Sequence, residues 1–362
     1  MMRLTAIRFV LLTFVNLAFL HLGTTTASAQ SKVEPGMPNP PSQPTEVKVG
    51  VFLADIIDLD ELNETFEVEL IVTAEWDDKR LAFDPEEEGA PYKLFQGAFQ
   101  FNEIYSAWWP QLLFVNQVGS GDVNAVKIMI APDGHVRYLD QRSVLLETPM
   151  KLRSFPFDTQ TLVGTIVSFG DYSDQVKLVV DERVLGASEA HAEANEDVNI
   201  AQWKLLGLDL KEQEADFRYY GGNRSFSELS LEITLKRQSK NLIWKVIVPL
   251  IILVLLMWAV FWLDPESLSD RLNVSFIGIL TIVAYQFLID GSMPRIDYFT
   301  FTDTILLYSF VVMCLTIFES LMISSLRKRG YTSFSNMVDR FFRWSFPIIY
   351  FAGLIASYLY YR

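Results

Sequence analysis

Two hydrophobic patterns follow one another along the chain. As far as residue 239, apolar residues come in short runs that alternate with polar ones; beyond it they form long unbroken stretches. In the run FEVELIVTAEW, Phe66, Val68, Leu70 and Val72 fall on one face, because successive side chains of a strand point to opposite sides. The pattern predicts strands in the first part of the chain and long apolar helices in the second.

The strand region has the turn signals of an all-β domain. VKIMIAPDGHVRYL predicts a hairpin with Pro132, Asp133 and Gly134 at its turn, and LSLEITLKR alternates again further along. Strands at this spacing, with no helical stretch between them, predict an immunoglobulin-like β-sandwich over residues 47–239, about 190 residues.

Four apolar stretches follow, each near the ~20 residues that a helix needs to cross a bilayer. We place these spans at 242–263, 272–289, 305–326 and 341–361 within a membrane domain of residues 240–362. The short loop 327–340 is strongly basic, which makes it cytoplasmic by the positive-inside rule. Its charged residues are Arg327, Lys328, Arg329 and Arg340, against the single acid Asp339.

The N-terminus predicts export. Residues 1–29 combine Arg3 and Arg8, a short apolar core and small residues that end at Ala29, as in a secretory signal peptide; a first membrane helix is the alternative. Residues 30–46 are rich in proline and polar residues and predict a flexible lead. We expect a multi-pass protein of the inner (plasma) membrane, with the sandwich on the periplasmic or extracellular side and the C-terminus also outside.

Charge is distributed unevenly along the chain, which limits the kinds of partner that the protein is expected to bind. The whole chain carries a net charge of −14, and its acidic excess lies in the sandwich region. This argues against nucleic acid, whose phosphates need clustered Lys and Arg, and favours the attraction of cations. The only cysteine, Cys314, lies in an apolar stretch, so neither an intrachain disulfide nor a zinc cluster is expected.

Enzymatic chemistry finds little support. There is no nucleophile–histidine pattern, glycine-rich phosphate loop or metal-ligand spacing, so we expect no enzyme activity and no cofactor. Outside the leader only His135 and His191 remain, as bystanders or proton sensors. Two acidic groups could titrate or hold a modulatory divalent cation, or form a solvated surface. They are Glu86, Glu87 and Glu88, and Glu189, Glu193, Glu196 and Asp197.

The second apolar stretch carries a periodic stripe. At 100° per residue, Asn273, Ile277, Leu280, Ala284 and Phe287 share one narrow face. Copied around a symmetry axis, the stripe would stack an amide ring and apolar rings that can close a pore by dewetting. A single helix cannot enclose a pore, so this reading needs an oligomer. The alternative is an ordinary apolar stripe with Asn273 hydrogen-bonded between helices.

The same helical geometry predicts the positions of the residues next to this stripe. Asp270 lies one turn below Asn273 and would add a carboxylate ring, besides a role as helix N-cap. Arg271 is 100° round from it and is expected to pack away from the axis. Off the stripe, three polar residues are expected to bond to neighbouring helices: Ser275, Thr281 and Gln286.

Three motifs follow one another in the strand region: EWDDKRL, WWPQLLFVN and SFPFDTQ around Phe157. They resemble, in this order, two strands and the signature loop of the pentameric ligand-gated ion channels, the Cys-loop receptors. Arg237 and Pro249 match the arginine before the first span and the proline within it. Thr148 and Leu162 stand where animal members have the bridging cysteines, so the chain resembles the bacterial branch, and its second span the amine-gated bacterial channels.

The resemblance implies a homopentamer, surrounded by membrane lipid, with external sandwiches that bind ligand between neighbours and a pore lined by the second spans. An acidic residue at the cytoplasmic mouth marks the family's cation channels, which points to Asp270, with Glu266 on the approach, and to permeating monovalent cations. Leu280 matches the mid-pore leucine and Phe287 an upper aromatic constriction, so the gate is expected among the apolar rings, which Ile277 and Ala284 complete.

The resemblance also implies a ligand site and a coupling site. Phe169, Phe226 and either Tyr219 or Tyr220 match an aromatic box for cations, which Val115 and Ile71 leave thinner than in acetylcholine receptors. The agonist is left open as a small amine, a metabolite or a proton. The coupling residues implied by the family are Pro156, Phe157, Asp158, Arg237 and Pro294, with Asp158 and Arg237 paired by charge. The alternative function is a membrane-tethered binding or sensory protein that conducts no ions.

Overall fold

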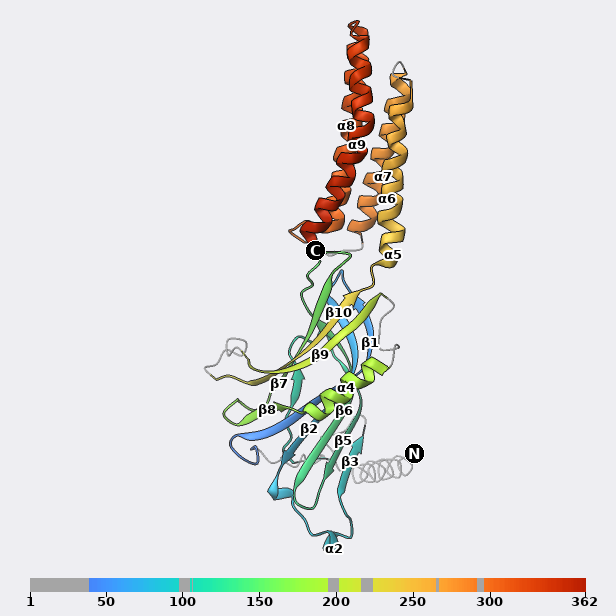
Figure 1. Cartoon of the computed structure of the whole chain (residues 1–362). Helices are drawn as coiled ribbons and strands as arrows, with labels where there is room; N and C mark the ends of the chain where they lie inside the picture. The colour runs from blue at the N-terminus through green and yellow to red at the C-terminus, as the bar shows by residue number, and fades with distance from the viewer. Residues whose placement is uncertain are drawn as a thin grey trace, which may run out of the picture.

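The computed structural model describes residues 39–97, 105, 107–194, 202–215, 224–264, 267–291 and 296–362. The signal peptide, most of the lead, and Tyr219, Tyr220, Glu266 and Pro294 lie outside these described residues. Strands occupy one end of the molecule and long helices the other, and the C-terminus lies where the two parts meet (Figure 1).

Within the described residues, ten strands form two sheets, as the predicted sandwich requires. The first sheet has the order β3-β5-β6-β2-β1-β8, with β1 and β8 parallel and the other pairs antiparallel. Its strands are β1 (Thr45–Asp60), β2 (Thr65–Asp77), β3 (Lys93–Gly97), β5 (Asp122–Ile130), β6 (His135–Glu147) and β8 (Val176–Val180). The second sheet has the order β4-β7-β10-β9 and is antiparallel. Its strands are β4 (Leu112–Phe114), β7 (Thr159–Ser168), β9 (Trp203–Glu214) and β10 (Ser227–Arg237).

The apolar and polar residues that alternate in the sequence are alternately buried and partly exposed in the structure. Phe66, Val68, Leu70 and Val72 of β2 are all buried in the core, while the residues between them are partly exposed. The predicted hairpin is present between β5 and β6, and Gly134 at its turn has φ +85°, a backbone conformation that glycine adopts without steric cost. The sequence therefore predicts this face of the sheet correctly.

The expectation of a strand domain without helices is wrong. Helix α4 (Glu182–Ala194) follows β8 and lies against β1 and β9, and a single turn, α2 (Pro85–Glu88), precedes β3. Ser188 of α4 accepts a hydrogen bond from the backbone N–H of Leu53 at 2.8 Å, and Val184 packs directly against Gly50. α4 is rich in Ala and Glu, which are strong helix formers, but it lacks the apolar period that marks a packed helix.

Four helical segments make up the second part. They are Lys240–Trp262, which includes α5 (Lys240–Leu242), a π turn (Ile243–Ile247), α6 (Val248–Trp258) and a 3-10 turn (Ala259–Trp262), then α7 (Leu268–Asp290), α8 (Phe301–Lys328) and α9 (Thr332–Tyr361). The first three segments are long and apolar enough to cross a membrane. α9 does not meet the same combined criterion of length and apolar composition. α8 contacts α7 and α9, and α6 contacts all three.

The predicted loop 327–340 is wrong in its extent. α8 continues to Lys328 and α9 already begins at Thr332, so only residues 329–331 separate the two helices. Of the basic residues that marked the loop, Arg327 and Lys328 end α8, Arg329 lies between the helices and Arg340 lies within α9. Helices can continue past the hydrocarbon layer, where polar side chains meet water and headgroups, so hydropathy alone cannot place their ends.

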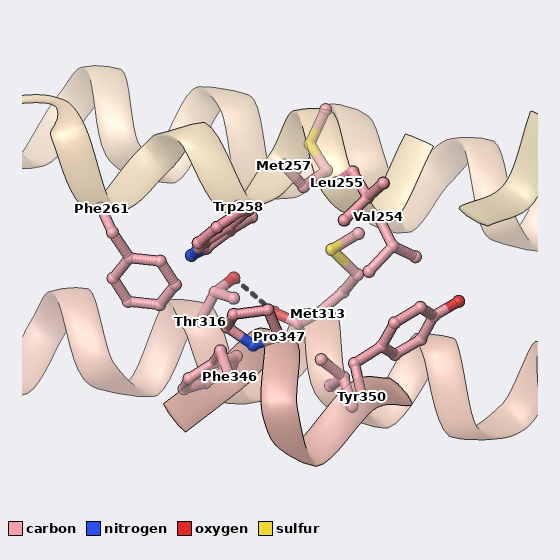
Figure 2. A pocket seen from close by; sticks show the side chains of 11 residues that line it. Val254, Leu255, Met257, Trp258, Phe261, Met313, Thr316, Phe346, Pro347 and Tyr350 are labelled. Carbon is pink, nitrogen blue, oxygen red and sulfur yellow. Dashed lines mark hydrogen bonds between the residues drawn. The ribbon is translucent and has the colours of Figure 1, made fainter. Parts of the chain in front are cut away.

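A proline within α9 determines how this helix packs. Pro347 has no N–H, which frees the carbonyl of Arg343 four residues earlier. The indole N–H of Trp258 in α6 donates to that carbonyl at 2.7 Å. Figure 2 shows Trp258, Phe346 and Pro347 around a cavity of about 20 Å³ whose wall is almost entirely apolar. This volume is little more than one water needs, so α6, α8 and α9 are closely packed here.

Candidate functional site

The two faces of α7 differ sharply. Along the predicted stripe Ile277, Leu280 and Phe287 are 61%, 71% and 73% exposed, and Asn273 and Ala284 are exposed as well. The opposite face is buried against the other helices through Arg271, Ser275, Gly278, Ile282 and Ile289. The subunit thus leaves the whole stripe uncovered. Its role in a pore stays a prediction, because a single chain encloses none.

Off the stripe, the three polar residues behave differently. Ser275 and Thr316 of α8 are joined by a hydrogen bond of 3.1 Å, as expected for a contact between helices. Thr281 instead donates to the carbonyl of Ile277 in its own helix at 2.8 Å, so that expectation is wrong. Gln286 is exposed. Hydroxyl groups in helices often use the carbonyl one turn back, which periodicity cannot distinguish from a neighbour.

At the start of α7, two adjacent charged residues take opposite environments. Asp270 is exposed, whereas Arg271 is only 1% exposed. The helix begins at Leu268 with Ser267 at the cap position, so the prediction that Asp270 caps it is wrong. Asp270 still lies in the first turn, where the helix dipole favours a negative charge. The expectation that Arg271 packs away from the open face is correct.

Arg271 is held by two acids that the sequence did not single out. Its Nη2 lies 2.9 Å from Asp339 of α9 and 3.0 Å from the carbonyl oxygen of Leu263. Its Nη1 lies 3.7 Å from Glu319 of α8. Asp339 also accepts from Arg343 at 2.9 Å. Nothing in a single sequence shows that these charges meet, because they lie on three different helices.

A second buried ion pair lies where the strands meet the helices. Arg237, at the end of β10, donates to both oxygens of Asp158 at 2.7 and 3.1 Å and to Glu61 at 2.6 Å. Burial alone would lower the pKa of Arg237, but its hydrogen bonds to Asp158 and Glu61 outweigh this and raise the pKa. The guanidinium also lies 4.1 Å from the ring centre of Trp203. The pairing of Arg237 with Asp158 is as predicted; Glu61 and Trp203 were not foreseen.

The signature loop contacts the helices directly. Phe157 packs edge-on against Phe301 of α8 and Tyr358 of α9, with ring centres 5.4 and 5.8 Å apart. Thr302 of α8 donates to the carbonyl of Phe155 at 3.1 Å, and Ser239, just before α5, donates to the carbonyl of Pro156. The loop from which Asp158 reaches Arg237 is therefore joined to the start or end of three helical segments. Its role in coupling stays a prediction.

The candidate ligand aromatics do not share one environment. Phe226 is buried against Tyr172, with ring centres 5.0 Å apart, and Val115 packs at their edge. The guanidinium of Arg224 lies 5.0 Å from the ring centre of Tyr172. Phe169 lies at the surface, 51% exposed. Tyr172 was missed because no motif marks it, although it lies only three residues after Phe169.

Acids near these aromatics have shifted pKa values. Burial raises the pKa of Asp171, although the indole N–H of Trp108 donates to this carboxylate at 3.1 Å and opposes the shift. Burial also raises the pKa of Glu228 on β10. His135 lies apart from them on the other sheet, 2.8 Å from Asp77 and 3.8 Å from Glu75. A proton at any of these groups would change the charge of the strand domain.

Comparisons with known proteins match this architecture. Residues 28–239 match the family model of the neurotransmitter-gated ion-channel ligand binding domain. The chain is 27% identical over 329 residues to a proton-gated ion channel of Gloeobacter violaceus, which covers 90% of this chain and 86% of that protein. It is 23% identical over 270 residues to the human glycine receptor subunit beta, covering 72% of this chain and 51% of that subunit. It is 22% identical over 284 residues to an acetylcholine receptor subunit beta of Xenopus laevis, covering 75% and 55%.

The two-sheet domain, the helices able to span a membrane and these matches together support a ligand-gated ion channel. The chain belongs to the neurotransmitter-gated ion-channel family, the pentameric Cys-loop superfamily. It is a multi-pass membrane protein with an extracellular N-terminal domain.

Proposed function

We propose that the chain forms a homopentameric, cation-selective channel opened by a small ligand or a proton. The observation that carries the proposal is the two-sided character of α7. Its apolar stripe and Asp270 are open, while the adjacent Arg271 is buried within the subunit. Apolar side chains this exposed on a membrane helix face lipid, a partner surface or a lumen, and the exposed carboxylate of Asp270 below the same stripe favours the lumen. In a ring of five, α7 would line the pore, and α9 would be the fourth span on the lipid side.

The charge pattern supports cation selectivity. Five Asp270 carboxylates at a narrow mouth would concentrate cations and repel anions. The acidic strand domain adds a negative field above the same axis. Glu266 on the approach remains a further candidate. The permeating ions are proposed to be monovalent cations, and a divalent cation is proposed only as a modulator.

The apolar rings support a hydrophobic gate. Leu280 and Phe287 are the most exposed large apolar residues of the stripe and lie about two turns apart, so each could form a separate constriction. A ring of leucine side chains excludes water when narrow, which stops ions without a physical plug. We propose that one of these two rings holds the closed state.

For the agonist, a proton and a small amine are both kept. The relative from Gloeobacter violaceus is a proton-gated channel, and the acids Asp171 and Glu228 have raised pKa values near the candidate ligand site. The Tyr172–Phe226 pair offers little aromatic face to a cation, because Phe226 is buried and the guanidinium of Arg224 already lies over Tyr172. These contacts favour the proton over a quaternary ammonium.

The test is electrical. The full chain is expressed in oocytes, and currents are recorded in a pH series and with a panel of primary amines. We expect evoked currents whose reversal potential follows the sodium or potassium gradient. Currents that follow the chloride equilibrium potential contradict cation selectivity. Silence under all conditions, with protein at the surface, favours the alternative of a tethered binding or sensory protein.

A further inference from the structure

We infer that Glu319 and Asp339 are positioning residues for ion selectivity, because they hold Arg271 behind the open face of α7. Of the adjacent residues Asp270 and Arg271, only Asp270 then presents a charged side chain at the mouth of the pore. The inference rests on the proposed cation-selective pore and adds to it the role of two acids on other helices.

The need for such a device follows from the sequence of the mouth. An aspartate and an arginine are neighbours at the start of α7, and consecutive helical positions lie 100° apart. Arginine has a long flexible stem, so an unheld Arg271 could extend its guanidinium toward the water of the mouth. Five such guanidinium groups would cancel the charge of five Asp270 carboxylates.

The structure shows how Arg271 is restrained. Asp339 lies 2.9 Å from its Nη2 and Glu319 lies 3.7 Å from its Nη1, and all three side chains are buried. Within the described residues, Nε and Nη1 of Arg271 have no hydrogen-bond partner. Arg271 therefore depends on few contacts: the two carboxylates and the carbonyl of Leu263.

Asp339 is itself fixed from a second side. Arg343, one turn further along α9, donates to its other oxygen at 2.9 Å. Arg343 is anchored in turn by the carbonyl of Phe261 at 2.7 Å and lies 5.2 Å from the ring centre of Trp262. Two arginines and two acidic side chains thus form one cluster that joins α7, α8 and α9.

Removing the acids would leave a buried, unpaired guanidinium, which is strongly unfavourable. The side chain can relieve this by moving to water, and the mouth of the pore lies on the adjacent face of its own helix. If Glu319 and Asp339 only stabilised the fold, a different experimental result would be expected. In that case, loss of either partner would weaken folding or gating alike and would leave the ion preference of open channels unchanged.

The experiment measures the ratio of cation to anion permeability from reversal potentials in a KCl gradient. Three channels are compared: the unaltered protein, Glu319→Gln/Asp339→Asn, and the same double variant with Arg271→Gln. We expect the double variant to lose about tenfold or more of the permeability ratio, and Arg271→Gln to restore most of it, because the freed charge is removed. The triple variant is also the matched control, since it keeps both altered acids.

The outcomes separate the two proposals. An unaltered channel that is not cation-selective refutes the proposed function, whatever the variants do. A selective channel whose ratio is unchanged in the double variant, or not restored in the triple one, overturns the role of Glu319 and Asp339. If the double variant does not reach the membrane, Glu319→Gln alone decides, because Asp339 still pairs with Arg271. We then expect a fall of about twofold to threefold, and an unchanged ratio overturns the inference.

Discussion

Arg237→Ala tests the contact between the strand domain and the helices most directly. The guanidinium and the carboxylate of Asp158 are each 1% exposed, and they share two hydrogen bonds. Without Arg237, the side chain of Asp158 keeps the hydrogen bond that the amide of Gln160 donates at 2.7 Å. Glu61 is more accessible and can be rehydrated, so the main cost falls on Asp158.

The size of the effect follows from this burial. Breaking a buried pair from one side costs about 3–5 kcal/mol, because a charge is left without a partner. For a domain of this size each kcal/mol lowers the Tm by roughly 2–4 °C, so we expect a fall of about 6–20 °C. Adding Asp158→Asn to Arg237→Ala removes the stranded charge and should recover part of the loss. The difference between the single and double variants measures the pair itself.

The assay combines thermal unfolding of the purified channel with agonist-evoked or proton-evoked current at matched surface expression. Lys211→Ala is the control, since Lys211 pairs with Glu232 at 2.6 Å on the exposed surface and should leave the Tm unchanged. We expect Arg237→Ala to impair assembly or gating as well as stability. A Tm within about 2 °C of the unaltered protein, together with normal gating, would refute the reasoning.

Leu280→Ser should wet the proposed mid-pore apolar ring and give leak current or heightened agonist sensitivity, and an unchanged channel counts against this gate. Asp171→Asn tests the raised pKa: the folded state holds this proton more tightly, so stability is lost as pH rises through the folded pKa. The variant should therefore gain Tm relative to the unaltered protein above that range, and an equal difference at all pH values contradicts this. Trp258→Phe leaves the carbonyl of Arg343 unpaired at a cost of about 1–3 kcal/mol, visible as a lower Tm, whereas Trp262→Phe should have less effect.

The open stripe of α7 was the part of the candidate site that the sequence could predict. Its five residues repeat with the helical period, and a period is a property of one element alone. The buried face of β2 was predictable for the same reason. The signature loop, Arg237 and Asp158 could be found because their motifs are local or at fixed spacing in the family.

The sequence alone could not predict that Tyr172 and Phe226 lie against each other at the candidate ligand site. Phe226 lies 54 positions after Tyr172 in the chain, and only the folded domain places the two rings 5.0 Å apart. α4 escaped prediction because the side that packs on β1 carries small or polar residues as well as leucine, at Leu185, Ser188 and Ala192, so only a weak apolar period marked it.

The sequence by itself determined which residues face which side: the strand alternation, the apolar helices and the stripe with Asp270 below it. Only the tertiary structure decided which residues of the chain these side chains contact. Arg271 meets Asp339 across 68 positions of sequence, and Arg237 meets Glu61 across 176. Periodicity fixes the direction of a side chain relative to its own element, but not which element lies opposite. Charge pairs between helices, and between domains, therefore depend on packing that no local pattern records.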